Sequence, residues 1–110
     1  MIFRCTICGY LHDGNEPPEV CPKCGADKSN FVEVAQDEAD KIIRARFTND
    51  LHLQLSSSLD TIIMITEEGI SDDLDPGCVD IFSKTRNWAL QSKKMITAEL
   101  ATHVKKGKWN

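Results

Sequence analysis

One short cysteine motif, present twice, constrains this chain more than any other feature. The pattern Cys-x-x-Cys-Gly occurs at Cys5–Gly9 and again at Cys21–Gly25, with twelve residues between Cys8 and Cys21. Two residues between the thiols allow one tight turn to direct both sulfur atoms toward one ion. Each glycine stands where the chain must turn through a left-handed conformation, which glycine adopts without strain. The motifs therefore predict a tetrahedral tetrathiolate site that suits iron or zinc; its ligands would be Cys5, Cys8, Cys21 and Cys24.

The cysteine usage supports metal ligation over disulfide bonding. The chain has 110 residues and five cysteines, an odd number that excludes a fully paired disulfide framework within one chain. The N-terminus shows no apolar segment typical of a secretory signal. We therefore expect a cytoplasmic location, where thiols stay reduced and clustered Cys-x-x-Cys pairs indicate a metal site.

Residues 1–35 read as a small domain of short strands and turns. They contain four of the five cysteines, three of the four prolines and three of the six glycines. About 35 residues are too few to build a sufficient apolar core. A bound metal is therefore expected to stabilise the fold of this segment. We predict strands at Ile2–Cys5, Tyr10–His12 and Phe31–Val34.

Residues 36–110 predict an all-α antiparallel two-helix hairpin. Apolar residues recur at steps of three and four, which indicates amphipathic helices at about 38–68 and 78–106. Gly69 is the expected stop of the first helix, and a short polar turn follows it. Residues 36–80 carry eleven acids and three bases, whereas residues 81–110 carry one acid and seven bases. Antiparallel packing places these opposite charges side by side.

The hairpin carries more apolar surface than one helix–helix seam can bury. Leu53 and Ile65 lie outside the main apolar stripe of the first helix. We expect two copies to form a homodimer, a four-helix bundle with twofold symmetry. The alternative is a monomer in which the N-terminal domain folds back over the exposed face.

Charge and hydropathy exclude two classes of partner. The formal net charge is -4, which argues against a nucleic-acid partner bound by bulk electrostatics. The longest apolar run, Ile62–Ile65, is far shorter than the ~20 residues of a membrane span. We therefore expect neither nucleic acid nor membrane as a partner.

Residues 2–34 resemble the rubredoxin-like domain, in the short form found in rubrerythrins. The resemblance rests on Phe3–Tyr10, Cys21–Ala26 and Phe31, and on the twelve-residue spacing between the motifs. It implies one Fe(Cys)₄ centre per chain that alternates between Fe²⁺ and Fe³⁺. The implied function is one-electron transfer between soluble proteins, such as a flavoprotein reductase and a terminal oxidase or peroxide reductase. By this interpretation the protein is a carrier and not an enzyme.

Two other functions remain open at this stage. The first is a zinc-stapled structural or interaction module, because the four thiols by themselves do not separate iron from zinc. The second is a rubrerythrin-like peroxide-reducing protein with a di-iron site in the bundle. Such sites need Glu-x-x-His motifs, whereas Glu99 and His103 are four residues apart and the domain order is reversed. The pair is better explained as a salt-bridged surface pair.

Two residues outside these motifs have open roles. Cys78 begins the second helix, where the helix dipole would lower the thiol pKa; a small buried core thiol is the other interpretation. Trp109 lies in a basic tail and would anchor that tail or contact a partner.

Overall fold

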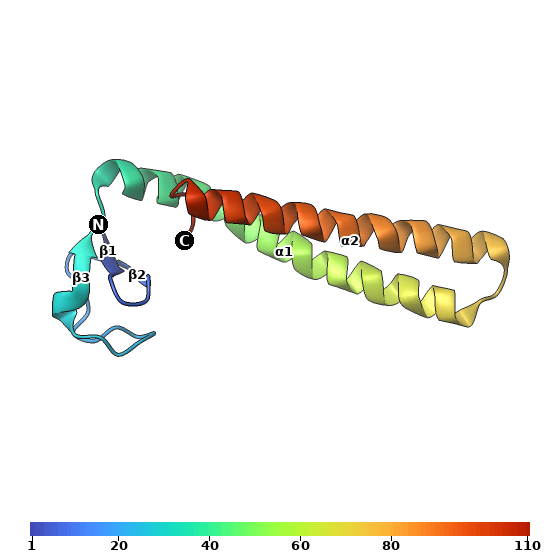
Figure 1. Ribbon diagram of the computed structural model, residues 1–110, viewed down its shortest axis with the longest axis horizontal. Helices are drawn as coiled ribbons and strands as arrows, with labels where there is room; N and C mark the ends of the chain where they lie inside the picture. Colours follow the sequence, from blue (N-terminus) through green and yellow to red (C-terminus); the bar gives the residue numbers. More distant parts are fainter.

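The computed structural model describes residues 1–110 as a small sheet domain joined to a long helical hairpin (Figure 1). The sheet has three short strands: β1 (Ile2–Cys5), β2 (Leu11–Asp13) and β3 (Phe31–Glu33). Two long helices follow: α1 (Gln36–Asp72) and α2 (Pro76–Lys105). The molecule is elongated, with extents of 63 × 27 × 18 Å. The predicted fold class, a four-cysteine knuckle with short strands followed by two helices, is confirmed.

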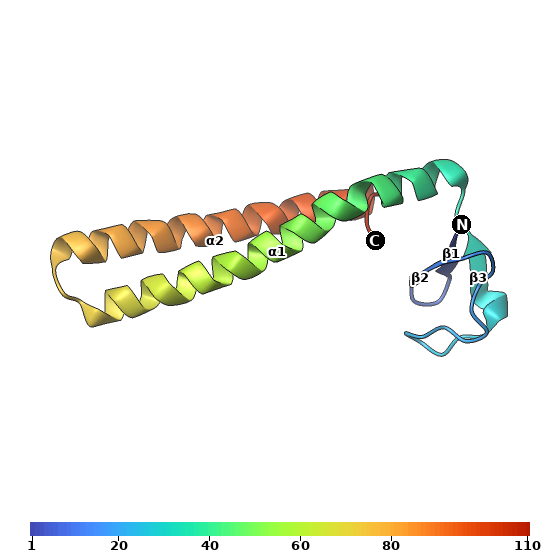
Figure 2. The ribbon, with the colours of Figure 1, turned by 180° about the vertical axis from the view of Figure 1, so that it is seen from behind.

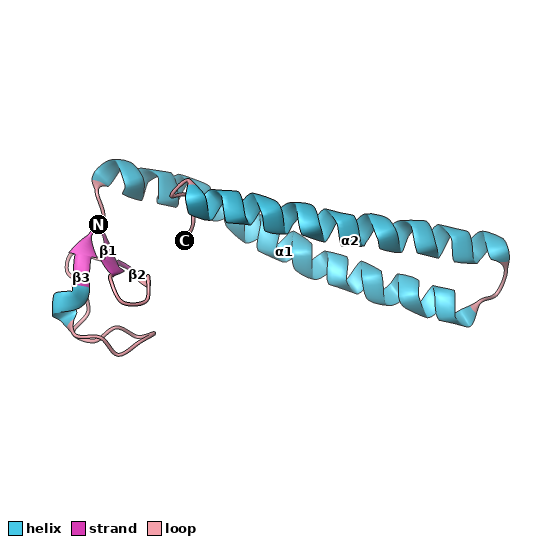
Figure 3. Ribbon diagram, viewed as in Figure 1, coloured by secondary structure: helices cyan, strands magenta, loops and turns pink.

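The sheet is antiparallel, with β1 in the middle and the order β2-β1-β3 (Figure 3). Phe3 of β1 lies opposite His12 of β2 and Glu33 of β3. Successive residues of a strand point to opposite faces of the sheet, and β1 has buried side chains on both faces. Phe3 and Cys5 pack on one face with Cys21 and Phe31, whereas Ile2 packs on the other face toward α1.

The sheet domain is docked on the first turns of α1. Ile2, Val34, Ala39 and Ile42 form a buried cluster that spans both parts of the chain. Two ion pairs also join the sheet domain to α1. Arg4 contacts Glu38 at 2.7 Å, and Arg46 donates two hydrogen bonds to the Asp13 carboxylate at 2.5 and 2.9 Å. The domain therefore lies at the end of the hairpin that is opposite the α1–α2 turn (Figure 2).

The two helices pack along a narrow seam. Leu59, Ala89 and Ile96 form its buried cluster, and Ile62, Ile63 and Leu100 pack against them. Only 13 of the 110 residues are buried. Most apolar side chains of the helices consequently lie at the surface of the single chain.

The predicted helix bounds are wrong at the turn. Gly69 does not end α1, which continues to Asp72; the stop is Asp73, whose φ of 51° is left-handed and whose N–H bonds to the Gly69 carbonyl. Gly69 is instead a position of close approach, because a Cβ there would lie 2.4 Å from the ring of Phe82. Helix α2 begins at Pro76, and the Asp75 side chain caps it by accepting from the Cys78 N–H. Neither helix has a segment long and apolar enough to cross a membrane.

Candidate metal centre

Two turns of the same construction present the four cysteines. In the first turn the Gly9 N–H donates to the Cys5 carbonyl, and in the second the Gly25 N–H donates to the Cys21 carbonyl, both at 2.9 Å. Each first cysteine also donates its own N–H to the carbonyl five residues later. Gly9 and Gly25 have φ values of 82° and 77°, so both positions require the left-handed conformation that glycine tolerates. The duplicated sequence motif is thus a duplicated backbone turn.

The four sulfur atoms lie at the corners of a small cluster. The Sγ atoms of Cys5 and Cys24 are 3.7 Å apart, and those of Cys8 and Cys21 are 3.6 Å apart. All four lie within 4.8 Å of one another, and none is in a disulfide. A tetrahedral metal with bonds of about 2.3 Å to sulfur needs sulfur atoms about 3.8 Å apart. The donor set and its spacing therefore fit a mononuclear iron or zinc centre.

The cluster is shielded on one side and open on the other. Cys5 and Cys21, the first cysteines of the two motifs, are each 1% exposed and pack against Phe3 and Phe31. Cys8 is half-buried, and Cys24 is exposed. The site is therefore anchored in the domain core, while one of its four ligand residues lies at the surface.

The thiols of the second motif have divergent acidities. Burial raises the pKa of Cys21, but hydrogen bonds from the backbone N–H groups of Cys24 and Lys23, together with neighbouring thiols, bring that pKa down to about 7. The Ala26 N–H lowers the pKa of Cys24, but burial and the other three thiols raise it to about 12. Adjacent thiolates repel one another, so all four ionise together only around a cation.

Glu99 and His103 form a pair within the hairpin and lie outside the cysteine cluster. The His103 Nε2 atom contacts the Glu99 carboxylate at 3.1 Å, and its Nδ1 atom contacts the Asn49 Oδ1 atom at 2.5 Å. The Asn49 amide also donates to the Lys108 carbonyl at 2.8 Å. Both ring nitrogens of His103 therefore have partners. Asn49, which is 4% exposed, gave no signal in the sequence, because its partners come from the far end of the chain.

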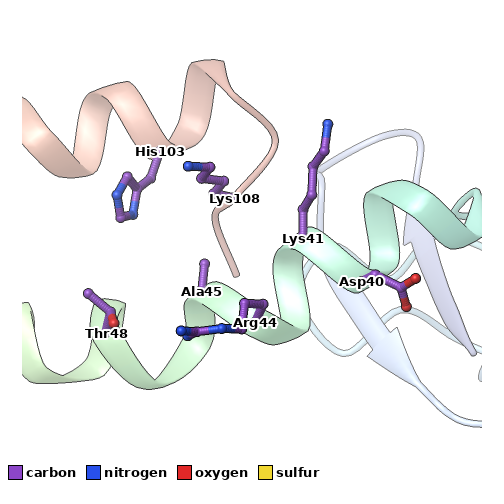
Figure 4. A pocket seen from close by; sticks show the side chains of 7 residues that line it. All are labelled: Asp40, Lys41, Arg44, Ala45, Thr48, His103 and Lys108. Atoms are coloured by element: carbon purple, nitrogen blue, oxygen red, sulfur yellow. The ribbon is translucent and has the colours of Figure 1, made fainter.

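A cleft of about 510 Å³ lies beside His103, between α1 and the C-terminal tail. Figure 4 shows His103 and Lys108 projecting into the space above α1, where Lys41 and Arg44 stand, whereas Asp40 points away. The cleft is basic, and its walls hold no group of three metal-ligating side chains; the cysteine cluster is the one such group in the chain.

The structure shows the surroundings of Cys78 and of Trp109, whose roles the sequence left open. The Asp75 carboxylate accepts a hydrogen bond from the Cys78 thiol and raises its pKa. The idea that the helix dipole lowers this pKa is therefore wrong, because the capping carboxylate dominates. Cys78 is half-buried.

Trp109 is also half-buried and lines a cleft with Leu53 of α1, so it lies against the first helix.

Comparison with known proteins identifies the N-terminal domain. The family model described as "Rubrerythrin, rubredoxin-like domain" matches residues 3–32. The rubredoxin of Megasphaera elsdenii is 35% identical over 48 residues, which cover 92% of that protein and 29% of this chain. The chain belongs to the rubredoxin family through this domain. The helical part matches no family model, and no solved structure matches the chain.

Two larger relatives share the same domain. The reverse rubrerythrin-1 of Clostridium acetobutylicum is 53% identical over 38 residues, which make up 34% of this chain and 20% of that protein. The rubrerythrin of Nitratidesulfovibrio vulgaris is 48% identical over 29 residues, 26% of this chain and 15% of that protein. The chain thus spans a fifth or less of these relatives, and the likeness stays within the rubredoxin-like domain.

Proposed function

We propose that the rubredoxin-like domain holds one iron and carries one electron at a time between soluble redox proteins. The ligands are the four cysteines of the two turns. The observation that carries this proposal is the spacing of their sulfur atoms, 3.6 and 3.7 Å across two pairs. When bound, the iron supplies reversible one-electron exchange between its ferrous and ferric states. Family membership favours iron over zinc, which the donor set accepts equally.

The protein itself supplies a rigid set of four ligands that is partly shielded from water. The paired backbone hydrogen bonds of the two turns hold the sulfur atoms in place, so little rearrangement accompanies a change of charge. Backbone N–H groups directed at the Cys21 sulfur stabilise negative charge there. With four cysteine ligands the site has no open position for a substrate. These features suit a carrier better than a catalyst.

The surface near the exposed cysteine suits brief contacts with partners. Ile7, within the first motif, is 66% exposed, and Val20, just before the second motif, is 59% exposed. Small interfaces are typical of weak redox complexes. We infer a flavoprotein reductase as electron donor and a terminal oxidase or peroxide reductase as acceptor. Five free cysteines suit a reducing compartment such as the cytoplasm.

Metal content and redox titration test this function. Protein from cells grown with ample iron is expected to contain one iron per chain and to cycle reversibly when titrated with dithionite and ferricyanide. Cys24→Ser should lose the ferric tetrathiolate spectrum, whereas the matched control Cys78→Ser should keep it. Zinc in place of iron, with no redox cycling, would refute the carrier and leave a zinc-stapled module. Clearly more than one iron per chain would instead indicate a second site in the helices.

A further inference from the structure

One side of the helical hairpin is a continuous apolar face. On α1 its residues are large and 45–72% exposed: Phe47, Leu51, Leu55 and Ile65. On α2 they recur at intervals of seven residues and are 57–64% exposed: Ile81, Trp88 and Met95. Leu55 and Met95 line one groove between the helices, so the two stripes lie on the same side. We call this set of seven residues the apolar face.

The opposite side of the hairpin carries the ion pairs that join the two helices, although exposed Met64 also lies there. A helix turns by about 100° per residue. With Leu59 facing α2, Leu51 lies about 80° to one side and Asp60 about 100° to the other. Asp60 pairs with Lys93 across the helices, and Glu67 pairs with Arg86 at 3.0 Å. The ion pairs that join the helices thus lie away from the apolar face, which has none.

We propose that a second copy of this chain covers the apolar face, with the two hairpins antiparallel. This inference is independent of the proposed electron transfer. The face is about 27 Å long, from residue 47 to residue 65 at 1.5 Å per residue, and about two helix diameters wide. The product of this length and width exceeds roughly 500 Å², and the uneven surface of the side chains adds to it. An exposed apolar area of this size is large for a monomer. It approaches the ~800 Å² per partner of a stable interface.

The charge along the hairpin selects the antiparallel orientation. The turn end, residues 65–85, carries six acids and one base. The other end, formed by residues 40–46 and 99–108, carries six bases and two acids. A parallel dimer would place the two acidic ends together, whereas an antiparallel dimer places each acidic end beside a basic end. Charge complementarity therefore favours a twofold axis perpendicular to the helices.

This twofold symmetry also places an acidic segment of the other copy at the basic cleft. The apolar stripe of α1 is centred near residue 56, so a twofold axis there places Arg44 beside Glu68 of the other copy. The Lys41–Arg44 segment, which lies in the cleft of Figure 4, would then meet the acidic turn end of the other copy. The two cysteine clusters would lie at opposite ends of the bundle, and each would meet redox partners independently.

Light scattering on the metal-loaded full chain tests the association. The expected mass is twice 12.3 kDa. Met95→Asp places a charge on the apolar face and should give a monomer with unchanged helicity by circular dichroism. The matched control Met64→Asp, four residues after Asp60 on the ion-paired side and similarly exposed, should remain a dimer. A monomeric wild-type chain at micromolar concentration overturns the proposal, as does a dimer that Met95→Asp leaves intact.

Two further measurements test the orientation, and they do not depend on the fold of Met95→Asp. A spin label at Leu74→Cys, in a Cys78→Ser background with metal bound, should give an inter-label distance of about 50 Å in the antiparallel dimer. A distance below about 25 Å indicates a parallel dimer and overturns this orientation. Reversing the charges of Lys41 and Arg44 to Glu should raise the dimer dissociation constant at least tenfold. Reversal at Lys94, on the far side of α2, should change it less than twofold; equal effects contradict the charge argument.

Discussion

Replacing Gly69 with alanine should destabilise the hairpin, although alanine is the better helix former. In an open helix the change would stabilise the protein by about 1 kcal/mol. Here an added Cβ would lie 2.4 Å from Cδ2 and Cε2 of Phe82 and 2.6 Å from its Cγ. Ordinary carbon contacts are about 3.5–4.0 Å, so the overlap is about 1 Å. Rotation of the ring about its own axis does not move Cγ, and relief therefore requires a new side-chain rotamer or separation of the helices.

The size of the effect follows from the two opposing terms. Overpacking of this kind costs about 1–3 kcal/mol, and the gain in helix propensity offsets about 1 kcal/mol of it. We expect a net loss of up to about 2 kcal/mol in the free energy of unfolding. Urea titration followed by far-ultraviolet circular dichroism measures it, at one fixed protein concentration because the proposed self-association would contribute to stability.

A double-mutant cycle isolates the contact between Gly69 and Phe82. In a Phe82→Ala background the clash is gone, so Gly69→Ala should be neutral or stabilise by up to about 1 kcal/mol. The change in sign between the two backgrounds is the diagnostic result. If Gly69→Ala stabilises the protein by about 1 kcal/mol even with Phe82 present, the close approach of the helices at this position is refuted.

Three further predictions follow from single side chains. Asn49→Ala leaves two half-buried partners, His103 and the Lys108 carbonyl, unpaired and should lower the free energy of unfolding by about 1–3 kcal/mol; a loss below about 0.5 kcal/mol in thermal unfolding would contradict this. The hydrogen bond from Arg46 lowers the pKa of Asp13, so this pair's contribution to stability is present above about pH 4 and is lost as the pH falls through the lowered pKa. An NMR titration of the Asp13 carboxyl should show a low midpoint that Arg46→Gln restores to the ordinary value. Because the Asp75 carboxylate raises the pKa of Cys78, Asp75→Asn should speed alkylation of that thiol at pH 8, and an unchanged rate would count against the contact.

Local sequence was enough to predict the cysteine turns and the helices. Each Cys-x-x-Cys-Gly turn closes through hydrogen bonds within six residues, so neighbouring residues specify it without help from the rest of the chain. The three strands were predicted to within one residue at every end, because turn residues bracket them. The helical periodicity likewise predicted two helices in an antiparallel hairpin.

The errors arose where residues distant in the sequence meet. Gly69 looked like a helix stop because its role depends on Phe82, thirteen residues away on the other helix. Cys78 is a local case: the sequence left open an acidified thiol and a buried core thiol, and the Asp75 side chain, three residues earlier, caps the helix and raises the thiol pKa. Asn49 was missed because its partners are supplied by the far end of the chain.

The amino-acid sequence by itself determined the ligand set, the two knuckle turns and the order of the elements, because each depends on contacts between near neighbours. Only the tertiary structure decided which cysteines are buried, how the sheet domain docks on α1, and that the seven residues of the apolar face share one side of the hairpin while the ion pairs that join the helices lie on the other. This last property depends on how the two helices rotate about their axes when they pack. That rotation is set by contacts such as Leu59 with Ala89 and Gly69 with Phe82, which join residues far apart in the chain.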